Sequence, residues 1–320
     1  MKKTTYKWLA FAALLTLMLA LAACGGKDKE TEGAKSDGSK DSSYKVEHAM
    51  GTAEVKSNKR VVVLTNEGTE AVLALGVKPV GAVKSWLGDP WYDHIKDDME
   101  GVEVVGDESA VNIEKVMALK PDLIIGNKMR QEKQYDELNK IAPTVFAEDL
   151  RGDWKINFEL YSKALNKEEK GKEVLAAFDK RIEDFKAEAG DKLKTEVSMV
   201  RFMPGKSRIY HQDSFSGVIL KQIGFARPGD QNKPDFAEEV TQERIPDMDG
   251  DMLFYFTYET GDGEATATEK EWTNNPLWKN LGAVKEGNAH KVSDAIWNTA
   301  GGVKAANLML DDLEKYFLEK

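Results

Sequence analysis

The sequence predicts an α/β protein with two Rossmann-like lobes joined by a single long helix. Short apolar segments such as 60–64 and 122–126 alternate with segments of helical period, which is typical of a mostly parallel sheet covered by helices. The same alternation resumes after residue 194. Between the two halves, residues 154–193 contain no proline and keep apolar side chains at helical spacing. A helix of that length can span a small domain, so we expect it to connect the lobes.

The first lobe, predicted for residues 46–153, is defined by apolar runs and by the residues that end them. Gly76 is placed to end a short helix, Asn112 to begin another, and Pro121 to stop it before the next strand. The predicted strands are 60–64, 79–83, 102–106, 122–126 and 144–147, and the predicted helices are 69–75, 113–119 and 131–141.

The second lobe, predicted for residues 194–320, repeats this plan. Gly224 is placed to end one helix, and Thr241 is placed to cap the start of another. The predicted strands are 197–203, 208–211, 251–258 and 290–292, and the predicted helices are 215–223, a short helix after Thr241, and 302–318.

The first 23 residues have the composition of a lipoprotein signal peptide. Lysines are followed by the apolar run 8–23, and small residues precede Cys24, the one cysteine of the chain. The run has about 16 residues, fewer than the roughly 20 that a transmembrane helix needs. Because 21–24 also matches the bacterial lipobox, we expect a lipid on Cys24 that anchors the protein to the outer face of the cell membrane. Residues 24–45 are almost entirely polar, so we expect a flexible tether.

Composition and motifs exclude several classes of function. The formal net charge of −10 argues against nucleic acid as a partner, since phosphates bind basic surfaces. The sequence lacks G-x-S-x-G, a phosphate-binding loop, H-E-x-x-H and a cysteine nucleophile, so we do not expect an enzyme. We expect no direct metal site, because the histidines are far apart in the chain. They are His48, His94, His211 and His290.

Arginine is scarce, because only eight of the 45 basic residues are arginines. A chain that uses lysine elsewhere can keep arginine for planar contacts with oxygen anions. Arg130 and Arg151 each follow a predicted strand, and open α/β sheets bind ligands beyond the carboxyl ends of their strands. We therefore predict that both arginines bind a ligand group from the first lobe.

Arg201 lies on the apolar face of the predicted strand 197–203, where a charge is costly unless it is paired. Two interpretations are open. The side chain could extend to solvent at the end of the strand, or it could present a positive charge to a ligand from the second lobe. Arg208 and His211, in the next predicted strand, are further candidates for this site.

Aromatic residues supply the remaining ligand-binding candidates. Trp86 lies in a loop with glycine and proline, Trp297 follows the last predicted strand, and Tyr258 ends the strand 251–258. Together they could form the wall of a ligand site, where the Tyr258 hydroxyl would donate a hydrogen bond. Alternatively, each tryptophan could simply fill a hollow in the surface.

A short pattern occurs once in each half. Residues 112–114 and 241–243 both consist of a capping residue, one further residue and a glutamate, and an aspartate begins a strand eight residues after each glutamate. Glutamate is favoured in the first turn of any helix, so the pattern could reflect helix formation alone. Alternatively, Glu114 and Glu243 share a function.

Several separated segments resemble one family, and they occur in the family's order. These segments, 60–83, 112–126, 138–146 and 297–313, are similar to the class of periplasmic binding proteins that serves iron-siderophore and cobalamin ABC importers. The resemblance is strongest to Bacillus-type lipoproteins that bind hydroxamate or citrate-hydroxamate siderophores. It implies a ligand cleft between the lobes, a ferric siderophore as the ligand and an ABC permease in the membrane as the partner.

The resemblance also implies roles for particular residues. Glu114 and Glu243, one in each lobe, would dock onto arginines of the permease. Iron would arrive inside the siderophore, so no resident cofactor is expected, and the chain is expected to be a monomer. Cobalamin is nearly neutral and would not need several arginines, whereas haem could use Tyr258 or His211 as an axial ligand. Haem and cobalamin stay as the alternative ligands.

Overall fold

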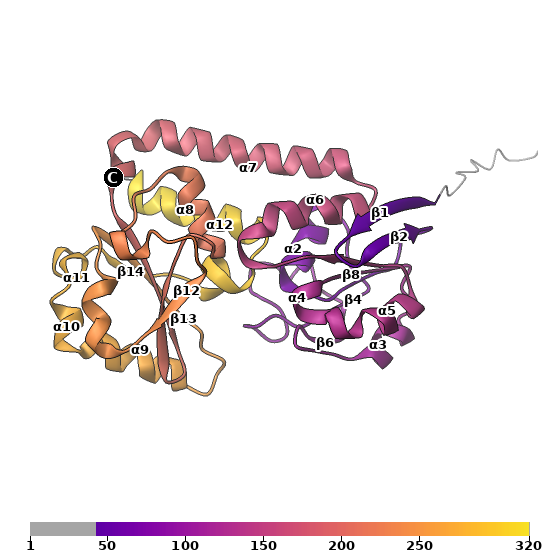
Figure 1. Ribbon diagram of the computed structural model, residues 1–320, viewed down its shortest axis with the longest axis horizontal. Coiled ribbons are helices and arrows are strands. Elements are labelled where there is room, and N and C mark those ends of the chain that lie inside the picture. Colours follow the sequence, from indigo (N-terminus) through magenta and orange to yellow (C-terminus); the bar gives the residue numbers. More distant parts are fainter. Residues whose placement is uncertain (1–42, 320) are drawn as a thin grey trace, which may run out of the picture. The chain divides into compact units, whose positions relative to one another are not determined.

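Two five-stranded sheets lie at the centres of two lobes in the computed structural model, which describes residues 43–319 (Figure 1). Both lobes belong to one compact unit of the chain, residues 41–320. The predicted signal peptide 1–23, Cys24 and most of the predicted tether lie outside the described residues. Within residues 43–319, no helix has an apolar stretch long enough to pass through a membrane.

The first lobe contains a fully parallel sheet, as predicted. Three of its strands, β3, β8 and β9, are buried along their whole length, which explains why they appear in the sequence as continuous apolar runs. From edge to edge the strands are β5 (Glu103–Val104), β4 (Gly81–Ala82), β3 (Val61–Val63), β8 (Leu123–Asn127) and β9 (Thr144–Ala147).

Helices of the first lobe begin at capping side chains. The Asn112 side chain accepts a hydrogen bond from the Lys115 N–H at 3.0 Å, as the sequence predicts. The Thr65 hydroxyl accepts one from the Gly68 N–H at 3.0 Å, so α2 begins earlier than predicted. The helices are α2 (Asn66–Ala74), α3 (Ile113–Ala118), α4 (Lys128–Gln131), the 3-10 turn η1 (Glu132–Gln134) and α5 (Tyr135–Ile141).

Two short hairpins accompany this sheet and are absent from the sequence prediction. One pairs β1 (Tyr44–His48) with β2 (Gly51–Val55), and the other pairs β6 (Gly106–Asp107) with β7 (Ala110–Val111). Composition assigns Tyr44 and its neighbour Lys45 to the tether, but both belong to β1. The reason is one aromatic side chain, because the Tyr44 hydroxyl donates a hydrogen bond to the Ala164 carbonyl at 2.7 Å and its ring packs against the core.

The helix that connects the lobes is confirmed, but it is shorter than the predicted 154–193. The segment forms two helices, α6 (Trp154–Ala164) and α7 (Glu168–Ala189), followed by the 3-10 turn η3 (Gly190–Lys194). Between them Asn166 has a φ of 53°, a left-handed conformation that asparagine tolerates, and the Lys167 N–H turns back to the Ser162 carbonyl at 2.8 Å. Helix α6 packs on α2 in the first lobe, so α7 alone is the connecting helix.

The second lobe has a mixed sheet. Strands β10, β13 and β14 are parallel, whereas β11 and β12 run antiparallel to their neighbours. The order is β12 (Ala237–Val240), β11 (Lys206–Tyr210), β10 (Val197–Met203), β13 (Met252–Thr257) and β14 (Ala289–Lys291). The strand β12 is absent from the prediction because two of its four residues are glutamates. The second half therefore repeats the first only in part.

In the second lobe, the end of one helix agrees with the prediction and the type of another helix does not. Helix α8 ends at Gly224, whose φ of 97° is left-handed, as predicted. Thr241 occupies the N-cap position of a short helix, as predicted, but that helix is a 3-10 helix with Pro246 inside it, and the Thr241 side chain makes no capping hydrogen bond. The helices are η2 (Arg151–Asp153, at the junction of the lobes), α8 (Phe215–Ile223), η4 (Gly229–Gln231), η5 (Gln242–Met248), α9 (Glu264–Asn274), α10 (Pro276–Lys279), α11 (Gly282–Glu286), the π-helix η6 (Ala295–Thr299) and α12 (Val303–Phe317).

The largest apolar core runs through both lobes. Side chains of α7 such as Phe178 and Ile182 and side chains of α12 such as Leu310 and Leu313 belong to it, together with residues from both sheets. Helix α12 contacts α7, α8 and also α2 of the first lobe. The C-terminal helix thus joins the second lobe to the first, in addition to α7.

Candidate functional site

A cavity of about 390 Å³ lies between the lobes and is lined by residues from both. Several lining residues follow the carboxyl ends of strands, where α/β sheets place their ligands, namely Arg130 after β8, Arg151 after β9 and Tyr258 after β13. Six of the eight ligand-binding candidates line this cavity: Trp86, Arg130, Arg151, Arg201, Arg208 and Tyr258. The other lining residues are Glu67, Glu108, Leu150, Met203, Phe215, Phe236 and the turn Asn298–Gly301, which begins with the last two residues of η6.

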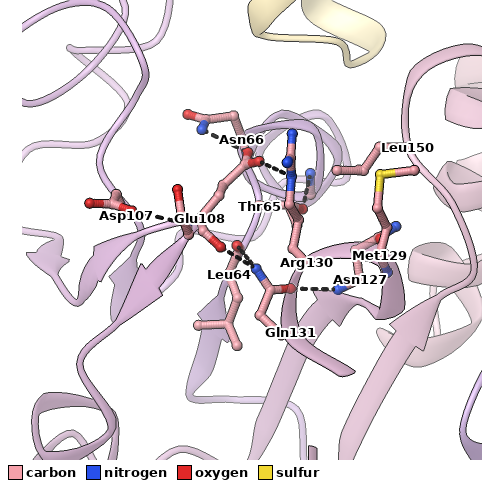
Figure 2. A network of polar contacts seen from close by, with 12 residues as sticks. Leu64, Thr65, Asn66, Asp107, Glu108, Asn127, Met129, Arg130, Gln131 and Leu150 are labelled. Atoms are coloured by element: carbon pink, nitrogen blue, oxygen red, sulfur yellow. Dashed lines mark hydrogen bonds and ion pairs between the residues drawn. The ribbon is translucent and has the colours of Figure 1, made fainter. Parts of the chain in front are cut away.

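Arg130 is carried by the short helix α4, which a polar network holds at the end of β8 (Figure 2). The Asn127 side chain caps this helix by accepting the Met129 N–H at 2.8 Å. The Gln131 amide donates to the carbonyls of Leu64 at 3.1 Å and Glu108 at 2.9 Å. These bonds tie α4 to β3 and to the β6–β7 hairpin. The position of Arg130 is therefore set by the backbone of the first lobe.

Two buried carboxyl groups line the cavity, and one of them lies beside Arg130. Glu108 Oε2 is 3.4 Å from Arg130 Nε, and its Oε1 accepts the Asn66 N–H at 2.6 Å (Figure 2). Burial raises the pKa of Glu108. Burial also raises the pKa of Glu67 well above its usual range, and Asn157 donates to Glu67 Oε2 at 3.2 Å. Glu108 is thus the carboxyl group within reach of the Arg130 guanidinium, whereas Glu67 has an environment that strongly favours its neutral form.

Arg201 is buried and paired, so its side chain does not extend to solvent. Its Nε and Nη2 donate to the two carboxylate oxygens of Asp294 at 2.6 and 3.0 Å, and its Nη1 is 3.3 Å from the Tyr210 hydroxyl. Burial opposes the charge of this guanidinium, but Asp294 and Tyr210 outweigh it and raise the pKa of Arg201. The guanidinium carbon lies 4.7 Å from the centre of the Tyr258 ring. The cavity wall thus contains a fixed cation whose counter-ion is Asp294.

Arg151 and Arg208 are less strongly paired than Arg201. Arg151 has a φ of 73° and lies over the Phe236 ring at 4.3 Å, and none of the ion pairs within residues 43–319 includes it. It also borders a smaller groove that four aspartates line: Asp149, Asp153, Asp213 and Asp235. Among the described side chains, Arg208 reaches one carboxylate, that of Glu239, at 3.7 Å. These two arginines have more freedom than Arg201 to turn toward a bound anion.

Two candidates from the sequence, His211 and Trp297, do not line the cavity. His211 is buried, with Nδ1 3.3 Å from the Gln231 carbonyl, and burial lowers its pKa. Trp297 is fully buried, packs against Phe254 with 4.6 Å between ring centres and donates a hydrogen bond to Asp312 at 2.8 Å. Both side chains belong to the interior of the second lobe. Among the described residues, no group of three or more histidine or carboxylate side chains is arranged to hold a metal ion.

Sequence reasoning missed several lining residues, and most carry no signal that could have identified them. Phe215 and Phe236 look like ordinary core residues, and Glu67 looks like a glutamate in the first turn of a helix. The turn Asn298–Gly301 is different, because Gly301 at its end and the adjacent Gly302 form a glycine pair directly before the last helix. Adjacent glycines at a helix start indicate a close approach of the backbone to another group.

Glu114 and Glu243 are both exposed. Glu114 lies in the first turn of α3, and Glu243 is the second residue of η5, where the Thr241 hydroxyl lowers its pKa. Neither takes part in an ion pair within the described part of the chain. Met117, one turn after Glu114, is 58% exposed. Each glutamate is thus free to meet a partner from outside.

Comparisons with known proteins agree on one family. The family model for periplasmic binding proteins matches residues 61–291. The chain is 56% identical over 319 residues to the probable siderophore-binding lipoprotein YfiY of Bacillus subtilis (strain 168), with 97% of both chains covered. It is 32% identical to the Fe(3+)-citrate-binding protein YfmC of the same organism, with 97% of this chain and 96% of that protein covered.

A solved structure supports the same assignment. The crystal structure of Staphylococcus aureus SirA complexed with staphyloferrin B has a TM-score of 0.78 and 38% sequence identity to this chain, and the match covers 85% of this chain and 98% of that one. The two-lobed architecture, the single connecting helix and the cavity between the lobes fit this likeness. The chain therefore belongs to the periplasmic binding protein family.

Proposed function

We propose that this chain captures a ferric siderophore in the cavity between its lobes and delivers it to an ABC permease for iron transport. The observation that carries the proposal is the convergence of four arginines from both lobes on one cavity. The names of the relatives support it, because one is a probable siderophore-binding lipoprotein and another is an Fe(3+)-citrate-binding protein.

The chemistry of the cavity suits an iron complex with negative charge, such as that of a citrate-hydroxamate siderophore. Guanidinium groups bind carboxylates through two parallel hydrogen bonds. Arg151 and Arg208 would turn to the ligand, while Arg201 supplies a fixed positive charge beside them. The rings of Trp86 and Phe236 offer apolar faces to the linkers between the iron-binding groups.

The proposed role is binding and transfer rather than catalysis. Iron is the cargo, and the siderophore supplies its ligands, so no resident cofactor is required. Haem and cobalamin are the alternative ligands. An axial bond from His211 to haem has no support, because that side chain does not line the cavity, and cobalamin leaves the arginine charges unused.

Tryptophan fluorescence provides the test, because Trp86 lines the cavity. A ferric citrate-hydroxamate siderophore should quench the fluorescence with sub-micromolar affinity. The comparison ligands are a ferric trihydroxamate without negative charge, haem and cobalamin. Tighter binding of haem or cobalamin than of any ferric siderophore would refute the proposal.

The electrostatic part of the proposal needs its own variant. Arg151→Ala with Arg208→Ala should weaken binding of the anionic siderophore at least tenfold and weaken binding of the uncharged one much less. The matched control is Lys172→Ala with Lys194→Ala, which removes the same net charge from exposed i,i+3 pairs on the surface. Equal loss in both double variants would show that only the overall charge matters.

Delivery to a permease rests on three groups. We propose that Glu114 and Glu243 dock onto the permease, and that a lipid on Cys24 holds the protein at the outer face of the membrane. Glu114→Ala with Glu243→Ala should abolish siderophore uptake by cells and leave siderophore affinity unchanged. Cys24→Ser should release the protein from the membrane. Loss of affinity in the glutamate variant would place these residues in the fold or the site instead.

A further inference from the structure

The N-terminus of α12 is capped by a side chain from the other lobe. The first N–H groups of a helix have no partner within the helix, and a side chain just before the helix usually accepts one of them. The residue at that place is Gly302, which has no side chain. Instead Glu70, in α2 of the first lobe, accepts the Ala305 N–H through Oε2 at 2.9 Å, across 235 residues of sequence.

Glu70 is held in this position from several sides. Its side chain is fully buried, and its second oxygen, Oε1, pairs with His94 Nε2. The His94 ring stacks on Tyr92 with 5.6 Å between ring centres. A Cβ atom added at Gly302 would lie 2.6 Å from both Cβ and Oε2 of Glu70. The φ of Gly302 is −114°, so the close approach of Glu70, and not the backbone conformation, requires glycine there.

The capped helix end is continuous with the wall of the cavity. The four residues Asn298–Gly301, directly before Gly302, line the cavity, whereas Glu70 does not. At the other end of the same stretch, Asp294 binds Arg201 of the second lobe and precedes the π-helix η6. Single π-helical turns are rare and occur frequently at functional sites. Residues 294–305 are therefore fixed at one end to Arg201 in the second lobe and at the other end to Glu70 in the first.

We propose that Glu70 is a positioning residue for the ligand site, which holds the turn Asn298–Gly301 in the cavity wall by capping α12 from the first lobe. This role rests on the proposed function of the cavity. Loss of the cap frees the turn, and a bound ligand must then order it again. Glu70→Ala should weaken siderophore binding about tenfold, within the range that a lost helix cap produces.

The conservative variant separates the cap from other roles. In Glu70→Gln the amide oxygen can still accept the Ala305 N–H, so binding should stay within about twofold of the wild type. Gly302→Ala pushes the Glu70 carboxylate away and should behave like Glu70→Ala. Its control is Gly229→Ala, because nothing lies within 4 Å of an added Cβ at that position. A second control, Lys304→Ala, removes the exposed ion pair with Asp98 beside the cap and should bind as the wild type does.

Two measurements decide the proposal, namely siderophore affinity by tryptophan fluorescence and hydrogen exchange of the Ala305 amide and of residues 298–301. Glu70→Ala should lose protection at these amides while the central strands stay protected. Unchanged protection at Ala305, unchanged affinity, or an equal loss of affinity in Glu70→Gln would each overturn the proposal. If the wild type binds none of the siderophores, the proposed function fails, whereas the exchange of Ala305 still shows whether Glu70 holds the turn. Gly302→Ala keeps the test decisive if Glu70→Ala does not fold.

Discussion

Replacement of Asp294 by alanine should strongly destabilise the protein, because it leaves Arg201 charged and unpaired in the interior. The two side chains are 10% and 1% exposed, and two charge-assisted hydrogen bonds of 2.6 and 3.0 Å join them. Removing one partner of such a buried pair costs about 3–5 kcal/mol. With an unfolding entropy of roughly 0.6 kcal/mol/K for a folded part of this size, the melting temperature should fall by roughly 5–8 °C.

Thermal and urea unfolding of Asp294→Ala, measured beside the wild type, test this value. The matched control is Asp311→Ala, which removes a carboxylate from the exposed ion pair with Arg181 and should cost less than about 1 kcal/mol. In the double variant Arg201→Met with Asp294→Ala, the buried charge is gone as well, so most of the stability should return. Siderophore affinity should not return, because Arg201 lines the cavity. A loss below about 1 kcal/mol in Asp294→Ala would refute the reasoning.

Three further predictions concern other parts of the chain. Burial raises the pKa of Glu67, so the folded chain retains a proton that the unfolded chain releases. The free energy of unfolding therefore falls as the pH rises from the ordinary glutamate pKa near 4.5 through the raised pKa of Glu67. The stability of Glu67→Gln relative to the wild type should therefore increase between pH 4 and pH 8 in thermal scans, and a flat difference would contradict the assignment. His211→Asn should leave siderophore affinity within twofold of the wild type in a fluorescence titration, because His211 does not line the cavity; a larger loss would place it at the site. The pKa of Glu259 is lowered to about 2 by hydrogen bonds from the Thr266 side chain and from backbone N–H groups, including that of Gly263. Glu259→Ala should therefore speed hydrogen exchange at the start of α9. Unchanged exchange would show that Glu259 does not cap this helix.

The part of the site in the first lobe could be predicted, because it depends only on the residues that directly follow each strand in the sequence. Apolar runs identify the buried parallel strands, and the residues that follow them lie at the carboxyl edge of the sheet. Arg130 and Arg151 could be predicted in this way. Arg201 could be predicted for another reason, since a charge within an apolar strand requires a partner. Its partner Asp294 could not, because the two lie 93 residues apart and only the fold brings them together.

Other features could not be predicted from the sequence, because residues of the same type in similar positions have different roles in the structure. Trp86 lines the cavity and Trp297 fills the interior, although each follows a strand of its own lobe. The break between α6 and α7 depends on one asparagine, Asn166, in a segment whose helical period continues on both sides. The sequence contains only one sign of the cap that Glu70 supplies to α12, namely the glycine pair at 301 and 302.

The β1–β2 hairpin determines where mechanical load would enter the molecule. The Tyr44 hydroxyl is bonded to the Ala164 carbonyl, and Asn58 bonds both to that hydroxyl at 3.0 Å and to the Leu165 carbonyl at 2.7 Å. Tension applied through the chain before Tyr44 would therefore pass into β1 and the end of α6, both in the first lobe. Helix α7 and the second lobe take no part in these hydrogen bonds. A pull on β1 would therefore be resisted first by contacts within the first lobe.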